Sequence, residues 1–252
     1  MATSNPAFSK DMFAGYEQVY GVPQSTAMTV QGTLSKTFLL LAILSATALW
    51  SWNAMASGQL PMSVLPIAGI AGFVVAIITT FKPTLAPWTA PIYAALEGAF
   101  LGALSQLVEM RFAAAYPGIA LQAVMLTCGT LLVMLFLYSS GIVRVTERLK
   151  AGIMMATGAV MLFYVASMLL SLFGVSIPFV FSATPIGIAF SLFVVGLAAF
   201  NLLLDFDFIE EGSRSQAPKY MEWYGAFGLM VTLIWLYLEM LRLLQKLASS
   251  RD

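Results

Sequence analysis

The feature that most constrains the fold is a series of seven apolar runs, each about 20 residues long. They cover residues 34–56, 62–81, 88–108, 119–139, 151–173, 184–204 and 224–244. A helix of about 20 residues crosses a hydrocarbon core about 30 Å thick. Lipid cannot hydrogen-bond free backbone amides, and the alternating ten-residue pattern of membrane strands is absent. We therefore expect an all-α integral membrane protein, a bundle of seven transmembrane helices.

The residues outside these runs form two tails and short connections. Residues 1–33 are polar and no apolar segment starts near Met1, which predicts a cytosolic tail rather than a signal peptide. We expect the membrane domain to cover residues 34–246 and a short C-terminal tail to cover 247–252. The longest connection, 205–223, is charged and is too short to form a soluble domain.

The composition excludes several classes of protein. Only 10% of the residues are charged, against roughly 25% in soluble domains. The net charge is zero and no basic block is present, so nucleic acid is not an expected partner. The chain has no His, a single cysteine (Cys128) and no Gly-x-Gly-Asp motif of intramembrane aspartyl proteases. We therefore expect neither an enzyme nor a bound cofactor, and the lipid bilayer is the predicted partner.

The distribution of basic residues predicts the orientation. With the N-terminus inside, the inner segments hold eight of the 12 basic residues: Lys10, Lys36, Lys82, Arg144, Arg148, Lys150, Arg214 and Lys219. The outer segments hold the other four: Arg111, Arg242, Lys246 and Arg251. Because basic residues are retained on the cytoplasmic side, we expect the N-terminus inside and the C-terminus outside.

Ionisable side chains inside a membrane span cost a few kcal/mol and normally face a partner, water or the bundle interior. Lys36 lies within a turn of the start of the first helix, where we expect its amine to reach the interface. Four ionisable residues remain within or at the end of spans: Glu97, Asp205, Glu239 and Arg242. These are the candidate functional residues.

Glu97 lies near the middle of the third run and is followed by Gly98 and Gly102, a GxxxG pair that predicts close helix approach. A hydrogen-bonded acid in a tight interface and a functional acid are equally consistent with this pattern.

Asp205 and Asp207 cannot face the same way, because helical geometry separates them by about 200°. Asp207 shares a face with Glu210 and Glu211, as expected of a solvated helix end. Asp205, one turn after Asn201, is therefore the better candidate for a bundle-facing acid. The alternative is an interfacial acid at a helix end with no task.

One face of the seventh run carries small and polar residues at spacings of three, four and seven: Gly225, Gly228, Thr232, Glu239, Arg242 and Lys246. We expect this face to meet protein or water. Arg242 follows Glu239 by three residues, so a purely structural ion pair within the helix is the alternative to a functional Glu239.

Several segments resemble one family of membrane proteins. They are Leu96-Glu97-Gly98 with Leu101-Gly102, Ile209-Glu-Glu-Gly212, and above all Leu236-Tyr-Leu-Glu239-Met-Leu-Arg242. These segments resemble the signature region of the Bax inhibitor-1-like family, and the run Tyr138 to Arg148 resembles its bacterial branch. The resemblance implies a seven-helix bundle with a central last helix, located in a bacterial cytoplasmic membrane.

The resemblance also implies a pH-dependent calcium leak. Family members that conduct calcium carry an acid at the end of the sixth helix, and Asp205 matches it here. They also carry an Asp in the seventh helix. Glu239 matches that position, with a side chain one methylene longer. These acids are expected to share a proton and hold the pore closed. Two nearby carboxylates in a low dielectric cannot both ionise easily, and calcium can relieve their repulsion once the proton is lost.

The primary hypothesis is a calcium-permeable channel or leak that responds to pH, with calcium and protons as its ligands and with or without proton coupling. Asp205 and Glu239 form the expected latch and calcium site, supported by Glu97, Asp207, Arg242 and Asn201. A transporter of another ion or solute is one alternative. A non-conducting scaffold that modulates other membrane proteins is the other.

Overall fold

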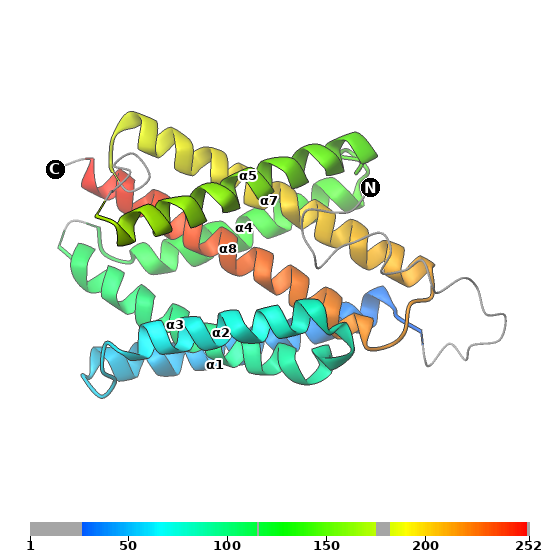
Figure 1. Ribbon diagram of the computed structural model, residues 1–252, viewed down its shortest axis with the longest axis horizontal. Coiled ribbons are helices and arrows are strands. Elements are labelled where there is room, and N and C mark those ends of the chain that lie inside the picture. Colours follow the sequence, from blue (N-terminus) through cyan, green and yellow to red (C-terminus); the bar gives the residue numbers. More distant parts are fainter. Residues whose placement is uncertain (1–26, 115, 175–181, 251–252) are drawn as a thin grey trace. The chain divides into compact units, whose positions relative to one another are not determined.

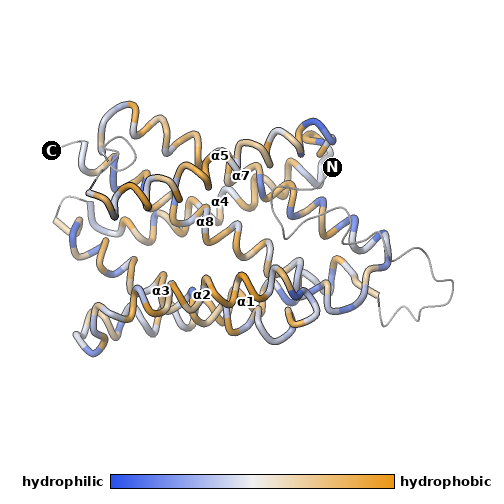
Figure 2. The backbone as a smooth tube through the Cα atoms, viewed as in Figure 1, coloured by the Kyte–Doolittle hydropathy of each residue, from blue (hydrophilic) through white to orange (hydrophobic). Residues whose placement is uncertain are grey.

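The computed structural model describes residues 27–114, 116–174 and 182–250. Within them lie seven long helices and the short 3-10 helix η4 (Pro83–Leu85) (Figure 1). The long helices are α1 (Val30–Ala56), α2 (Val64–Phe81), α3 (Ala86–Phe112), α4 (Ile119–Ser139), α5 (Glu147–Leu172), α7 (Pro185–Arg214) and α8 (Met221–Ser249). All seven are long and apolar enough to cross a membrane. Figure 2 shows hydrophobic residues along most of their length. The predicted all-helical fold class is confirmed.

Most helix boundaries agree with the apolar runs within a few residues, and local chemistry fixes several of them. Thr29 caps α1, because its hydroxyl accepts a hydrogen bond from the amide of Gly32 at 3.0 Å. Thr146 caps α5 in the same way. Gly118 precedes α4 with φ +79°, a left-handed conformation that glycine adopts at no steric cost. Most of the predicted N-terminal tail, residues 1–26, lies outside the described residues.

The sixth long helix continues well beyond the end of its apolar run. The run ends at 204, whereas α7 continues to Arg214 and α8 begins at Met221, so the charged stretch 205–223 is helical for most of its length. Charged residues end a hydrophobic run, but they do not end a helix. The stop comes where the amide of Ala217 bonds the carbonyl of Gly212 at 3.0 Å and Pro218 follows.

Contacts divide the chain into two compact units. The described part of the first unit contains α1, α2 and α3, α7 from Asp207 onward, and α8 up to Val231. The described part of the second contains α4, α5, α7 up to Phe206, and α8 from Thr232 onward. Helix α8, the seventh long helix, is the most buried of all, with 72% of its apolar stretch inside the protein. It contributes to both units.

In the first unit, α3 packs closely against α1. A Cβ atom on Gly98 would overlap the hydroxyl of Thr47 and the carbonyl oxygen of Leu44. A Cβ atom on Gly102 would overlap the carbonyl oxygen of Ala48. The GxxxG pair therefore brings two helix backbones together, as its spacing predicts.

A buried ion cluster joins the start of α8 to the start of α1, also in the first unit. Glu222 is fully buried, and its Oε1 accepts hydrogen bonds from the amide of Thr29 (3.0 Å), the hydroxyl of Thr29 (2.8 Å) and Lys219 (2.8 Å). Its Oε2 pairs with Lys36. The amine of Lys36 thus binds a carboxylate of α8, a partner that the sequence did not indicate. A Cβ atom on Gly32 would overlap that carboxylate.

We expect Gly98→Ala and Gly102→Ala to lower the thermal midpoint in detergent, since overpacking a tight interface costs about 1–3 kcal/mol. Gly129→Ala in α4 is the matched control, because a Cβ atom there meets open space and alanine favours helix by about 1 kcal/mol. Equal midpoints for all three variants would contradict the tight α1–α3 interface.

Candidate functional site

Polar side chains of α5, α7 and α8 meet along one face of α8 in the second unit. We call this set the polar column; its members are Thr157, Tyr164, Ser191, Asn201, Asp205, Thr232, Glu239, Arg242 and Lys246. Thr232 and Lys246 lie 14 residues apart on α8, which is about 21 Å of helix. The polar column therefore extends along about two thirds of the thickness of a hydrocarbon core.

Asp205 lies near one end of the polar column. It is 2% exposed and accepts a hydrogen bond from the hydroxyl of Thr232. Its Oδ2 is buried and has no hydrogen-bond partner among the described residues. Asp207, two residues later, is partly exposed. The two carboxylates therefore occupy different environments, as the helical spacing predicts.

Glu239 is held by two neighbours. Its Oε1 accepts hydrogen bonds from Arg242 at 2.8 Å and from the hydroxyl of Tyr164 on α5 at 3.1 Å. Arg242 also donates to that hydroxyl at 2.7 Å and lies over the Tyr164 ring. The ion pair within the helix, which is the structural alternative to a functional Glu239, is therefore present, and α5 adds a third member that the sequence did not indicate. The Oε2 of Glu239 is buried without a partner among the described residues.

Asn201 lies between the levels of these two acids, and Lys246 extends the polar column beyond Glu239. Asn201 lies one turn before Asp205, and its amide donates to the hydroxyl of Thr157 on α5 at 2.8 Å. Lys246, at the C-terminal end of α8, is 4% exposed. Its amine donates to the carbonyl of Gly187 at 2.9 Å and to the hydroxyl of Ser191 at 2.8 Å.

Asp205, on α7, meets the face of α8 that carries Glu239, but at a different level along the helix. Asp205 meets α8 at Thr232, seven residues or about 10 Å of helix before Glu239. No hydrogen bond between the two acids occurs in the described part of the chain. Each acid instead keeps one free buried oxygen. A shared proton remains a prediction for this pair.

Glu97 is also buried, but it lies in the first unit rather than in the polar column. Its side chain lies against α2, where a Cβ atom on Gly72 would come within 2.6 Å of its Oε1. No hydrogen bond joins it to another described residue. It is thus a separate buried acid, and the described structure assigns it no partner in the site.

The polar column supplies oxygen atoms rather than a ready-made metal site. No group of three or more His, Cys, Asp or Glu side chains that could hold a metal ion occurs among residues 27–114, 116–174 and 182–250. A proton or a cation would therefore meet one carboxylate at a time, together with hydroxyl and carbonyl oxygens. A hard cation binds firmly only when several oxygens surround it.

The charges of the polar column balance only when Asp205 is ionised. Glu239 and Arg242 neutralise each other at 2.8 Å. Asp205 faces a neutral hydroxyl, and Lys246 faces a neutral carbonyl and a neutral hydroxyl. A proton on Asp205 therefore leaves one excess positive charge in the polar column, at Lys246.

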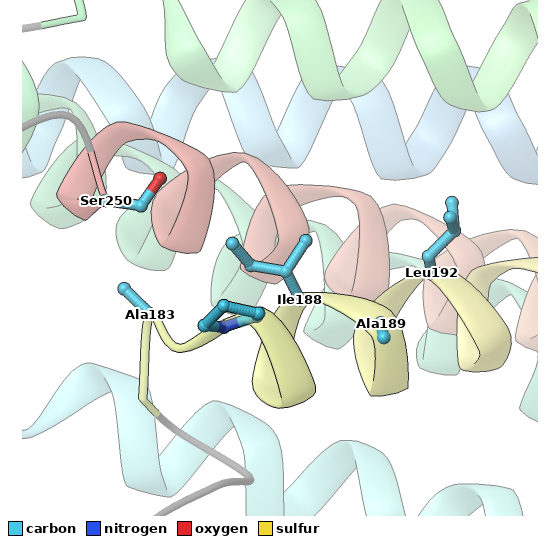
Figure 3. A pocket seen from close by; sticks show the side chains of 6 residues that line it. Ala183, Ile188, Ala189, Leu192 and Ser250 are labelled. Atoms are coloured by element: carbon cyan, nitrogen blue, oxygen red, sulfur yellow. The ribbon is translucent and has the colours of Figure 1, made fainter.

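A shallow apolar groove lies over the start of α7 and the end of α8 in the same unit (Figure 3). Its volume is about 660 Å³, and it is lined by Ala183, Pro185, Ile188, Ala189, Leu192 and Ser250. Ser250 supplies the one hydroxyl among these lining side chains. The groove therefore has no charged group with which to bind an ion.

The fold and this set of buried charges define a seven-span helical membrane protein with a polar interior. The chain belongs to the Bax inhibitor 1-like family, whose model matches residues 5–249. This is a family of membrane proteins linked to calcium leak and generally without enzymatic activity. No curated protein and no solved structure matches the chain.

We expect Tyr164→Phe to lower the thermal midpoint in detergent, because it removes the hydroxyl that joins α5 to Glu239 and Arg242. Hydrogen bonds between membrane helices contribute on average about 0.6 kcal/mol and at most about 1.7 kcal/mol. Tyr93→Phe is the matched control, since Tyr93 is buried and its hydroxyl makes no hydrogen bond within the described structure. Identical losses in the two variants would contradict a specific role for the Tyr164 hydroxyl.

Proposed function

We propose that this protein is a pH-sensitive, calcium-permeable leak whose path follows the polar column and whose conductance depends on Asp205 and Glu239. The observation that carries the proposal is a pair of buried oxygens, Oδ2 of Asp205 and Oε2 of Glu239, that have no partner among the described residues and lie along one polar face of an otherwise apolar bundle. A buried polar atom without a partner costs free energy, so its persistence in a membrane span indicates a task.

The carboxylates of Asp205 and Glu239 can bind both calcium and protons. Carboxylate oxygens are preferred ligands of calcium, and they also bind protons. With a proton on Asp205, the polar column has an excess positive charge and repels cations. When Asp205 loses that proton, the charges balance and a cation is admitted, so the leak should increase as the pH rises.

The two acids act together in this proposal. The family resemblance pairs them, and Asp205 on α7 meets the face of α8 that carries Glu239. A shared proton would require Glu239 to leave Tyr164 and Arg242 and approach Asp205. Thermodynamic coupling between the two positions is the signature of that state.

The orientation that we propose places the N-terminus in the cytosol and the C-terminus across a bacterial cytoplasmic membrane. Its support is the excess of basic residues on the predicted inner segments and the resemblance of the run Tyr138 to Arg148 to bacterial members. Lys246 and Arg242 then lie toward the outer side, and the Glu222 cluster lies toward the inner side.

Calcium flux into proteoliposomes, measured as a function of pH, tests the proposal. We expect wild-type flux to rise with pH. Asp205→Asn, which mimics the protonated acid, should keep flux low and remove most of the pH dependence. Asp207→Asn is the matched control: it removes a carboxylate two residues away that is partly exposed, and it should leave the pH profile unchanged.

The double variant Asp205→Asn/Glu239→Gln tests coupling. If the acids share a proton, the double change should do little more than either single change, whereas additive shifts in the pH midpoint would reject sharing. Sodium, potassium and proton arms of the same assay distinguish an exchanger from a calcium leak. Absence of every flux, with stable co-purified membrane proteins, would contradict the leak and favour a scaffold.

A further inference from the structure

Lys246 is the least expected member of the polar column. The residue is 4% exposed, and among the described residues the hydrogen-bond partners of its ammonium are both neutral. A buried ammonium in a membrane protein is normally paired with a carboxylate, because the cost of removing it from water is several kcal/mol. The nearby carboxylate of α8, on Glu239, is already bonded to Arg242.

The surroundings of the amine resemble those of a bound cation. The carbonyl oxygen of Gly187 and the hydroxyl oxygen of Ser191 lie one turn apart on α7 and both lie within 2.9 Å of Nζ. Hydroxyl and carbonyl oxygens are the groups that replace the hydration shell of a free cation in selective pores. Here a side chain of the protein supplies the cation.

The hydroxyl of Ser191 does not donate to the carbonyl four residues earlier, unlike several other hydroxyls within the helices of the described structure. Thr37, Thr79, Thr127 and Ser167 all donate their hydroxyl to the carbonyl four residues earlier, which satisfies the group inside a membrane helix. Ser191 makes no such bond to Gly187 in the described structure. Instead, its Oγ and the carbonyl oxygen of Gly187 both accept hydrogen bonds from Lys246.

We propose that Lys246 is a tethered plug. Its ammonium occupies a cation site formed by the Gly187 carbonyl and the Ser191 hydroxyl, at the end of the polar column nearest the C-terminus of α8. Removal of the lysine side chain admits a free cation to this site. The site would take small monovalent cations and primary ammonium ions. This inference rests on the proposed leak for its effect on flux, but the site itself can be tested without flux.

The first test is binding. Lys246→Ala empties the site and should lower the thermal midpoint in detergent, and propylammonium should restore it. Tetramethylammonium has the same charge but no N–H to donate, so it should not restore the midpoint. Lys82→Ala, which removes an exposed lysine, is the control and should show neither the loss nor the rescue. Absence of rescue by propylammonium would overturn the cation site.

The second test is flux. At an effective dielectric constant of about 20, removing a unit charge beside the path should raise cation flux roughly tenfold or more. We expect Lys246→Ala and the neutral Lys246→Met to show this rise, and Lys246→Arg to retain low flux. Propylammonium should block Lys246→Ala and leave wild type unchanged. Unchanged flux in Lys246→Met, in a protein whose Asp205-dependent leak is intact, would overturn the plug. Rescue of stability without any flux would contradict the proposed leak while leaving the site in place.

Discussion

Lipid offers no hydrogen bonds, so every polar side chain between the membrane helices needs a partner within the protein. This constraint accounts for the arrangement of the second unit. Polar residues of α8 form hydrogen bonds to α5 and α7 along one face. Thr232 binds Asp205, and Glu239 and Arg242 bind Tyr164. Lys246 binds Ser191 and Gly187. Apolar residues such as Val160, Val194 and Leu197 pack around these contacts. The polar column both holds the helices in place and supplies the only chemistry that we assign to them.

The same constraint explains why two buried oxygens are informative. Glu222 in the first unit is buried as completely as Asp205, yet both of its oxygens have partners. Such a satisfied carboxylate joins α1 to α8 and needs no further explanation. Asp205 and Glu239 each keep one oxygen without a partner in the described part of the chain. The contrast within one chain separates an acid that stabilises the fold from acids that have capacity left for a proton or a cation.

The sequence predicted most of the fold, because the length of each apolar run follows directly from the thickness of a bilayer. It also predicted which of Asp205 and Asp207 is buried, since helical spacing decides it. The sixth apolar run ends at 204 whereas α7 continues to Arg214, because charge ends a hydrophobic run before it ends a helix. Tyr164 and the Glu222–Lys36 pair were missed. These contacts join residues 75 or more positions apart, and a single sequence has no periodicity that reports them.

The central claim is that the polar column is a path that water and cations can enter when Asp205 is ionised. Labelling of Leu236→Cys, in a Cys128→Ala background, with a cationic methanethiosulfonate tests it most directly, because Leu236 is fully buried on α8 between Thr232 and Glu239. At one fixed pH above neutrality we predict labelling that calcium slows and that Asp205→Asn largely abolishes. Phe200→Cys on α7, where the side chain is 43% exposed on the apolar surface, should stay unlabelled throughout. Labelling of Leu236→Cys that neither calcium nor Asp205→Asn changes, or no labelling at all, would contradict the account.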